Sequence, residues 1–124
     1  MATPKLKAQA GKLNMVIEQG ATFNPVLTYQ DADGNIIDLT SFTARMKIKD
    51  SRSDATALEE LTTENGGITL GGVAGTIALL FDDAATAAMT WESGVYDLEL
   101  ISGSSIVTRL LQGVVTVSAE VTTT

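Results

Sequence analysis

The stretch Thr43-Ala44-Arg45-Met46-Lys47-Ile48-Lys49 decides the fold class, because apolar and basic residues alternate along it without a break. Successive side chains of a β-strand point to opposite faces of the sheet. Ala44, Met46 and Ile48 therefore share one face, and the three basic residues share the other. This pattern predicts a strand that is buried on one side and solvated on the other.

The same alternation recurs farther along the chain. In Val95-Tyr96-Asp97-Leu98-Glu99-Leu100, the tyrosine and both leucines face inward while the two acids face water. The segments Ile68–Leu70 and Thr76–Phe81 flank the glycine-rich stretch Gly71–Gly75, which predicts a hairpin. Alternation of this kind favours an all-β protein.

The C-terminal run from Ile106 to Val121 is rich in Val and Thr and is joined to the preceding strand by the turn Ser102-Gly103-Ser104-Ser105. A glycine inside a strand pattern indicates a bulge or a bend. We therefore expect two strand halves, one on either side of Gly113.

Two further strands are expected near the N-terminus, at Leu13–Ile17 and Phe23–Tyr29. Pro25 has no N–H to donate, so the second is an edge strand or pairs only after Pro25. Asp82–Met89 predicts one short helix, with aspartate at its start. The chain is thus predicted to be an antiparallel β-sandwich of seven to nine short strands with one short helical connection.

The composition of the 124-residue chain limits its function as much as its fold. It contains no histidine and no cysteine, so the usual general base, the commonest metal ligand and the most nucleophilic side chain are all missing. We expect no enzyme activity and no cofactor. The formal net charge of -7 disfavours nucleic acid as a partner, because affinity for phosphates depends on clustered Lys and Arg.

The basic residues Lys5, Lys7 and Lys12 indicate an N-terminal arm, residues 1–12, ahead of a sandwich domain over residues 13–124. No apolar run approaches the ~20 residues of a membrane helix. Residues 1–7 lack the apolar core of a secretory signal. We expect a soluble product of the cytoplasm with no membrane partner.

The stretch Asp31-Ala32-Asp33-Gly34-Asn35 has oxygen side chains at alternate positions, as a calcium loop does. Such a loop also needs glycine at its sixth position and glutamate at its twelfth, which are Ile36 and Phe42 here. Asp33-Gly34 is a dipeptide of tight hairpin turns. We predict a turn and no metal site.

Two adjacent carboxylate pairs, Glu59-Glu60 and Asp82-Asp83, are candidates for paired acid–base chemistry. Neighbours on a strand point to opposite faces, so we interpret both pairs as solvated surface charge. Trp91 is expected to close one end of the core. A stacking platform for sugars, at Trp91 or Tyr96, is the alternative.

The motifs, taken in order, resemble those of small virion proteins of tailed bacteriophages and their prophages, over residues 14–122. A more distant similarity is to the immunoglobulin-like N-terminal domain of phage baseplate upper proteins, which attach receptor-binding components to the tail. The stretches that carry the resemblance are Glu18–Phe23, Asp33-Gly34-Asn35, Asp38–Lys49, Leu61–Ile68, Gly75-Thr76-Ile77, Val95–Leu100 and Arg109–Gly113.

The resemblance implies a virion structural protein, made in the host cytoplasm, whose immunoglobulin-like β-sandwich docks on other tail, baseplate or fibre-attachment proteins. It implies no catalytic, cofactor-binding or metal-binding residues. We expect a homo-oligomer within the virion, with the arm at residues 1–12 and the C-terminal strand contacting partners. Capsid decoration on the phage head and carbohydrate binding at a host surface remain alternatives.

Overall fold

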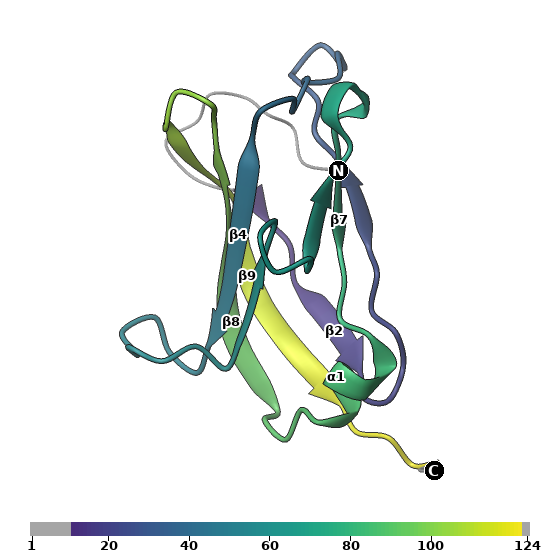
Figure 1. Ribbon diagram of the computed structural model, residues 1–124. Coiled ribbons are helices and arrows are strands. Elements are labelled where there is room, and N and C mark those ends of the chain that lie inside the picture. Colours follow the sequence, from purple (N-terminus) through teal and green to yellow (C-terminus); the bar gives the residue numbers. More distant parts are fainter. Residues whose placement is uncertain (1–10, 123–124) are drawn as a thin grey trace.

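The computed structural model describes residues 11–122 as two β-sheets packed against each other (Figure 1). Residues 1–10 and 123–124, which include most of the predicted arm, lie outside the described part. The strands are β1 (Gly11–Lys12), β2 (Met15–Glu18), β3 (Val26–Thr28), β4 (Thr43–Lys49), β5 (Glu59–Thr62), β6 (Ile68–Leu70), β7 (Thr76–Leu79), β8 (Ser93–Ile101) and β9 (Val107–Ser118).

The larger sheet has the strand order β1-β9-β8-β4-β5, with β2 also paired to β9, and the smaller sheet has the order β3-β7-β6. In the lettering used for immunoglobulin domains, β3, β4, β5, β6, β7, β8 and β9 correspond to strands B, C, C′, D, E, F and G. The larger sheet then has the order G-F-C-C′ and the smaller sheet the order B-E-D, which is the strand arrangement of immunoglobulin domains. The predicted immunoglobulin-like sandwich is confirmed. Its pairs are antiparallel except at one edge, where β1 and β2 run parallel to β9.

The inner faces of the two sheets form an aliphatic core, as the alternation predicted. Ala44, Met46 and Ile48 of β4 are each 1% exposed, and Leu98 of β8 is fully buried. From β7 and the segment that follows it, the buried residues Ile77, Leu79 and Phe81 pack into the same cluster. Among the described residues, no buried side-chain nitrogen or oxygen lacks a hydrogen-bond partner.

The predicted local elements are confirmed. The glycine-rich hairpin joins β6 to β7 through the 3₁₀ turn η1 (Gly72–Ala74), and β3 begins directly after Pro25 at a sheet edge. The short helix α1 (Asp83–Ala87) begins after Asp82, whose carboxylate accepts a hydrogen bond from the Ala85 N–H. No helix in the described part of the chain is long and apolar enough to cross a membrane.

The predicted division of the C-terminal strand at Gly113 is wrong. β9 continues through Gly113, and its register irregularity lies at Leu110, between the pairs Leu98–Leu111 and Glu99–Arg109. A Cβ at Gly113 would lie 2.3 Å from the Leu13 carbonyl oxygen. The glycine therefore permits close approach of the neighbouring chain, which itself breaks between β1 and β2.

The position of β9 limits how the C-terminal strand can contact a partner, because much of its backbone is already paired within the chain. β9 lies between β8 on one side and β1 and β2 on the other. Backbone pairing occupies both of its edges at Leu111–Gln112 and Val115–Thr116. Gly11 and Lys12, placed in the predicted arm, are the strand residues of β1.

Candidate functional site

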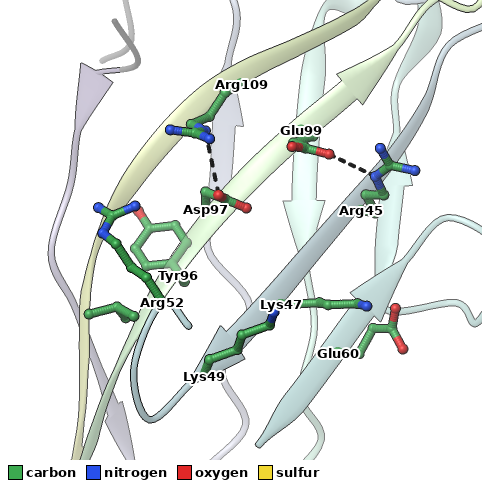
Figure 2. A pocket seen from close by; sticks show the side chains of 10 residues that line it. Arg45, Lys47, Lys49, Arg52, Glu60, Tyr96, Asp97, Glu99 and Arg109 are labelled. Atoms are coloured by element: carbon green, nitrogen blue, oxygen red, sulfur yellow. Dashed lines mark hydrogen bonds and ion pairs between the residues drawn. The ribbon is translucent and has the colours of Figure 1, made fainter. Parts of the chain in front are cut away.

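The outer face of the larger sheet contains a shallow hollow lined mainly by charged side chains (Figure 2). Five of its lining residues are cations and three are carboxylates. A chain with a formal net charge of -7 thus has a local excess of positive charge at this place. We call this site the basic hollow; its residues are Arg45, Lys47, Lys49, Arg52, Glu60, Val95, Tyr96, Asp97, Glu99 and Arg109.

Strand register explains how the basic hollow is built. Residues paired across neighbouring strands point to the same face of a sheet. Lys47 of β4 is paired with Glu60 of β5 and Asp97 of β8, so acids flank it on both sides. Cation and carboxylate therefore alternate across the strands, and the outward orientation predicted for the basic residues of β4 is confirmed.

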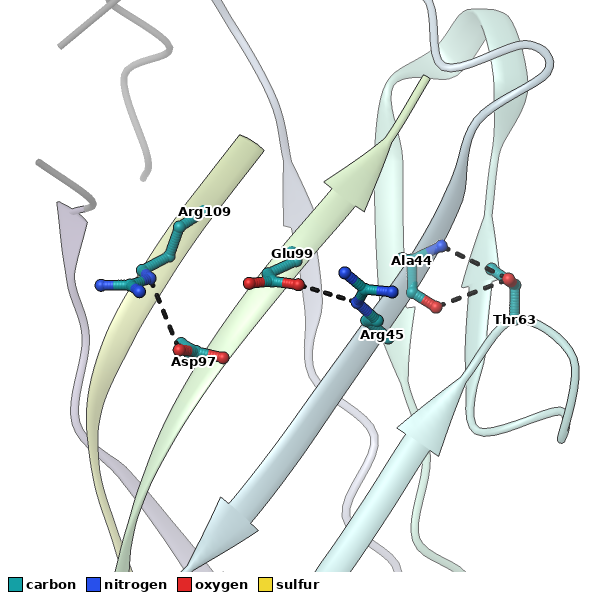
Figure 3. Close-up of polar contacts among 6 residues, drawn as sticks. All are labelled: Ala44, Arg45, Thr63, Asp97, Glu99 and Arg109. Atoms are coloured by element: carbon teal, nitrogen blue, oxygen red, sulfur yellow. Dashed lines mark hydrogen bonds and ion pairs between the residues drawn. The ribbon is translucent and has the colours of Figure 1, made fainter. Parts of the chain in front are cut away.

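Two of the cations are neutralised within the sheet (Figure 3). The Arg45 Nε lies 2.7 Å from the Glu99 Oε1, and the Arg109 Nε lies 3.4 Å from the Asp97 Oδ2. Both pairs are partly exposed, and exposed ion pairs stabilise a fold by only about 0.2–1 kcal/mol. These two pairs leave the remaining cations of the basic hollow without a carboxylate of their own.

The other three cations of the basic hollow, Lys47, Lys49 and Arg52, have no carboxylate within 4.0 Å among the described residues. Arg52 donates only a long hydrogen bond, 3.5 Å, to the side-chain oxygen of Gln112. Gln112 is also the register partner of Lys12, which places Lys12 on the same side of the sheet. All the cations of residues 11–122 thus lie on or beside this one face.

An apolar strip adjoins the charged part of the same face. Lys49 is paired with Val95, and Val95 is paired with Val114, which is 41% exposed. Farther along the sheet, Val16 of β2 is 60% exposed and is paired with Thr116. The face therefore combines an excess of positive charge with exposed apolar side chains that a protein partner could bury.

The stretch Asp31–Asn35 is the turn that the sequence predicted. The Asp31 Oδ1 accepts hydrogen bonds from the N–H groups of Asp33 and Asn35, each 2.9 Å long. Gly34 has a φ of 86°, and a backbone bridge between Gln30 and Ile36 closes the hairpin. The hydrogen bond from the Asn35 N–H lowers the pKa of Asp31, because it stabilises the carboxylate.

Neither carboxylate pair forms an acid–base dyad. Glu60 faces the basic hollow, whereas the Glu59 Oε2 accepts a hydrogen bond of 3.2 Å from the Trp91 indole N–H. Asp82 caps α1 and Asp83 begins it, so helix geometry, not strand alternation, sets their directions. Trp91 is half-buried against the core, in agreement with the prediction that it closes one end.

Tyr96 is not a stacking platform, so that alternative is wrong for this residue. It is 3% exposed, although part of it lines the basic hollow. Its hydroxyl donates a 2.5 Å hydrogen bond to the Leu13 carbonyl oxygen and thereby ties β8 to the chain between β1 and β2. Burial raises the pKa of Tyr96 to about 12, because the phenolate is poorly solvated inside the protein.

Sequence reasoning did not single out Arg52, Glu60 or Arg109 as members of a common site. The alternating stretch of β4 showed that its three basic residues share a face, but not what lies beside them. Arg109 joins the site only because β9 pairs with β8. No local pattern reports that pairing.

No family model matches the chain, and no curated protein matches it. Many solved structures are similar in fold, three of them as follows. The extracellular domains of the voltage-gated sodium channel β4 subunit have a TM-score of 0.47 at 12% identity, with 94% of this chain and 100% of that chain covered. A second structure, of sodium channel β subunits, has a TM-score of 0.44 at 11% identity, with 94% and 98% covered.

The third structure, extracellular domains 3–5 of Drosophila OTK, has a TM-score of 0.37 at 16% identity. It covers 89% of this chain and 34% of the other. These values carry no argument about binding partners. The architecture rests on the strand order itself.

Proposed function

We propose that this chain is a non-catalytic structural module of a tailed-bacteriophage virion, which docks on other tail, baseplate or fibre-attachment proteins. The sequence motifs over residues 14–122 support the phage assignment. The immunoglobulin-like sandwich suits a docking role, since it presents large sheet surfaces on a rigid core. In this proposal the mature protein is located in the virion, as a homo-oligomer.

The observation that carries the docking role is the distribution of charge. The basic hollow contains five of the eight cations of the chain, while twelve of its fifteen carboxylates lie elsewhere. Three of these cations have no carboxylate within 4.0 Å among the described residues. Uncompensated charge adds little to the stability of a monomer but guides association and fixes orientation.

A protein partner fits this face better than a nucleic acid does. Glu60, Asp97 and Glu99 stand among the cations of the basic hollow and would repel a phosphate backbone. The adjoining valines give a protein partner apolar area to bury. Carbohydrate binding has less support, because Tyr96 is buried and the Trp91 N–H is already bonded to Glu59.

The test is to locate the protein on intact particles of a phage that encodes it. Immunogold labelling of purified virions is expected to mark the tail or its baseplate. In particles assembled from a Lys49→Glu, Arg52→Glu variant, we expect incorporation to fall at least about tenfold, since truncating or reversing charges at a contact weakens it strongly.

A matched control is Thr69→Glu, which adds negative charge on the exposed outer side of β6 in the other sheet. This variant should be incorporated as well as the wild type. Label confined to the head would favour capsid decoration instead. Absence of label from purified particles would contradict a virion role altogether.

A further inference from the structure

One end of the sandwich has the opposite electrostatic character to the basic hollow. We call it the acidic end; its carboxylates are Glu18, Asp82, Asp83, Glu92 and Glu120. The Gln19 side chain donates a hydrogen bond to the Met89 carbonyl and accepts one from the Glu120 N–H. Each bond is 2.9 Å long, and together they connect the chain after β2, the chain after α1 and the C-terminal segment. The end of β2, α1 and the C-terminal segment lie at this end in Figure 1.

The acidic end has charge that its own surroundings leave uncompensated. None of its carboxylates forms an ion pair with another described residue. The cations of residues 11–122 all lie on or beside the outer face of the larger sheet instead. Each copy of the chain thus has a positive face and a negative end that form no ion pair with each other among residues 11–122.

From this complementarity we propose that the basic hollow binds the acidic end of a second copy of this chain. Lys49 and Arg52, which form no ion pair among residues 11–122, supply the cations, and Asp83 and Glu92 of the other copy are exposed carboxylates able to meet them. Pairing across such a contact fixes register and orientation. The inference extends the proposed function, since it names one of the partners on which the module docks.

Apolar side chains support the same contact. Beside the cations of the basic hollow lie Val95 and Val114. Beside the carboxylates of the acidic end, the helix α1 exposes the small side chains of Ala84 and Ala87. Charge can therefore face charge while alanine covers valine, which adds burial of apolar surface to the electrostatic attraction.

The contact joins two different patches, so it is heterologous. Repetition of a heterologous contact produces a closed ring when the rotation closes and an open chain when it does not. Either product is a homo-oligomer. A symmetric dimer formed through one shared patch is not compatible with this proposal.

Sedimentation velocity of the purified full-length protein is the test. At low salt we expect the average mass to rise with concentration, and at 0.5 M salt the association should weaken because exposed charges are screened. Lys49→Glu with Arg52→Glu, and separately Asp83→Lys with Glu92→Lys, should each raise the dissociation constant at least about tenfold. Circular dichroism melting shows whether each variant is folded.

The Asp83→Lys, Glu92→Lys variant distinguishes a specific contact from a general effect of net charge on association. Each of its two reversals adds two positive charges, which brings the formal net charge of -7 closer to zero. General repulsion between copies would fall, so a net-charge effect predicts stronger association. The proposed contact predicts weaker association.

Mixing the two variants provides the decisive result. The Lys49→Glu, Arg52→Glu variant retains its acidic end, and the Asp83→Lys, Glu92→Lys variant retains its basic hollow. Together they should form a one-to-one heterodimer that grows no further. A wild-type protein that stays monomeric up to about 1 mM at low salt overturns the proposal. A mixture of the two variants that remains monomeric also overturns the proposal. The same holds if the Asp83→Lys, Glu92→Lys variant associates as strongly as the wild type.

The outcome is independent of the location in the virion. Monomeric protein that is nevertheless found on particles would mean that the basic hollow binds a different virion protein. Self-association without any label on particles would retain this contact and reject the proposed function.

Discussion

The outer faces of the two sheets differ far more than their inner faces do. Both inner faces are aliphatic and contribute to one core. The outer face of the larger sheet contains the basic hollow, whereas the register of the smaller sheet places only uncharged residues outward. These residues are Val26, Thr28, Thr69, Thr76 and Ala78.

This difference separates two demands on the sequence. Burial of apolar surface in the core determines the fold, and it requires apolar side chains on both inner faces. Solvated outer positions contribute little to stability, so residues there can serve other purposes. In the proposed function, the charged face is the surface that makes the oriented contact.

The largest expected effect comes from comparing a buried and an exposed leucine at the end of the smaller sheet. The comparison tests whether the outer side of that sheet is in contact with solvent. Leu79 is fully buried, and the adjacent Leu80 is 40% exposed. Leu79→Ala should lower the free energy of unfolding by about 2–5 kcal/mol, since it leaves a cavity in the core. Leu80→Ala should cost less than about 1 kcal/mol. Urea unfolding measures both, and equal costs would mean that another chain covers this face.

The second prediction compares the tyrosines associated with the two sheets as pH rises. Burial raises the pKa of Tyr96 in β8 to about 12, above the unfolded value of about 10. In the folded state Tyr96 therefore holds its proton more tightly than in the unfolded state. The contribution of Tyr96 to the free energy of unfolding is complete below about pH 10 and is lost between about pH 10 and 12. The loss should be about 2–3 kcal/mol, at 1.36 kcal/mol per pKa unit.

Comparison of urea unfolding for wild type and Tyr96→Phe isolates this loss from other groups that titrate at high pH. The variant should lack the extra decrease, although it loses the hydrogen bond to Leu13 at neutral pH. Tyr29, which follows β3, is less buried and also has a raised pKa. Tyr29→Phe should change the pH dependence less, and an equal change would contradict the assignment to Tyr96.

The third prediction concerns the free edge of the charged sheet. The Asn65 side chain accepts hydrogen bonds from the N–H groups of Thr62 and Gly67 and donates to the Glu60 carbonyl. It thereby covers the outer edge of β5, where unpaired backbone groups would invite another strand. Asn65→Ala should cost about 1–2 kcal/mol, at about 1 kcal/mol per net hydrogen bond with partial replacement by water.

Asn65→Asp is the matched control, because its carboxylate still accepts from both N–H groups and loses only the bond to Glu60. It should cost less than the alanine variant in urea unfolding. Light scattering at elevated temperature should show faster aggregation for Asn65→Ala alone. Identical behaviour of the two variants would mean that the edge does not need this cap.

Local patterns predicted which side chains of each strand face inward, but not which strands are neighbours. The alternation at Thr43–Lys49 and Val95–Leu100 reports burial directly, since both strands have one solvated face. The pairing of Met15 with Val115 joins residues a hundred positions apart, and nothing in either segment encodes it. The prediction for Gly113 is wrong for the same reason, because a glycine in a strand is consistent with a bulge or with close approach of another segment, and only the tertiary structure distinguishes them.

The site was predictable to the same extent as the fold. The basic face of β4 followed from its own alternation. Its meeting with Arg109 and Asp97 depended on strand order, and Arg52 enters from the loop after β4. The turn at Asp31–Asn35 was predicted correctly because its geometry is set within five residues.

The smallest expected effect addresses the charged face itself, through a double-mutant cycle on Arg45 and Glu99. Their ion pair is 2.7 Å long, but the Arg45 side chain is 52% exposed. The coupling energy from Arg45→Ala, Glu99→Ala and the double variant in urea unfolding should therefore be about 0.2–1 kcal/mol, and should decrease with added salt. A coupling above about 2 kcal/mol would assign these charges to stability and remove the contrast between the faces. A small coupling would agree with the proposal that the cations of residues 11–122 gather on this sheet to recognise a partner.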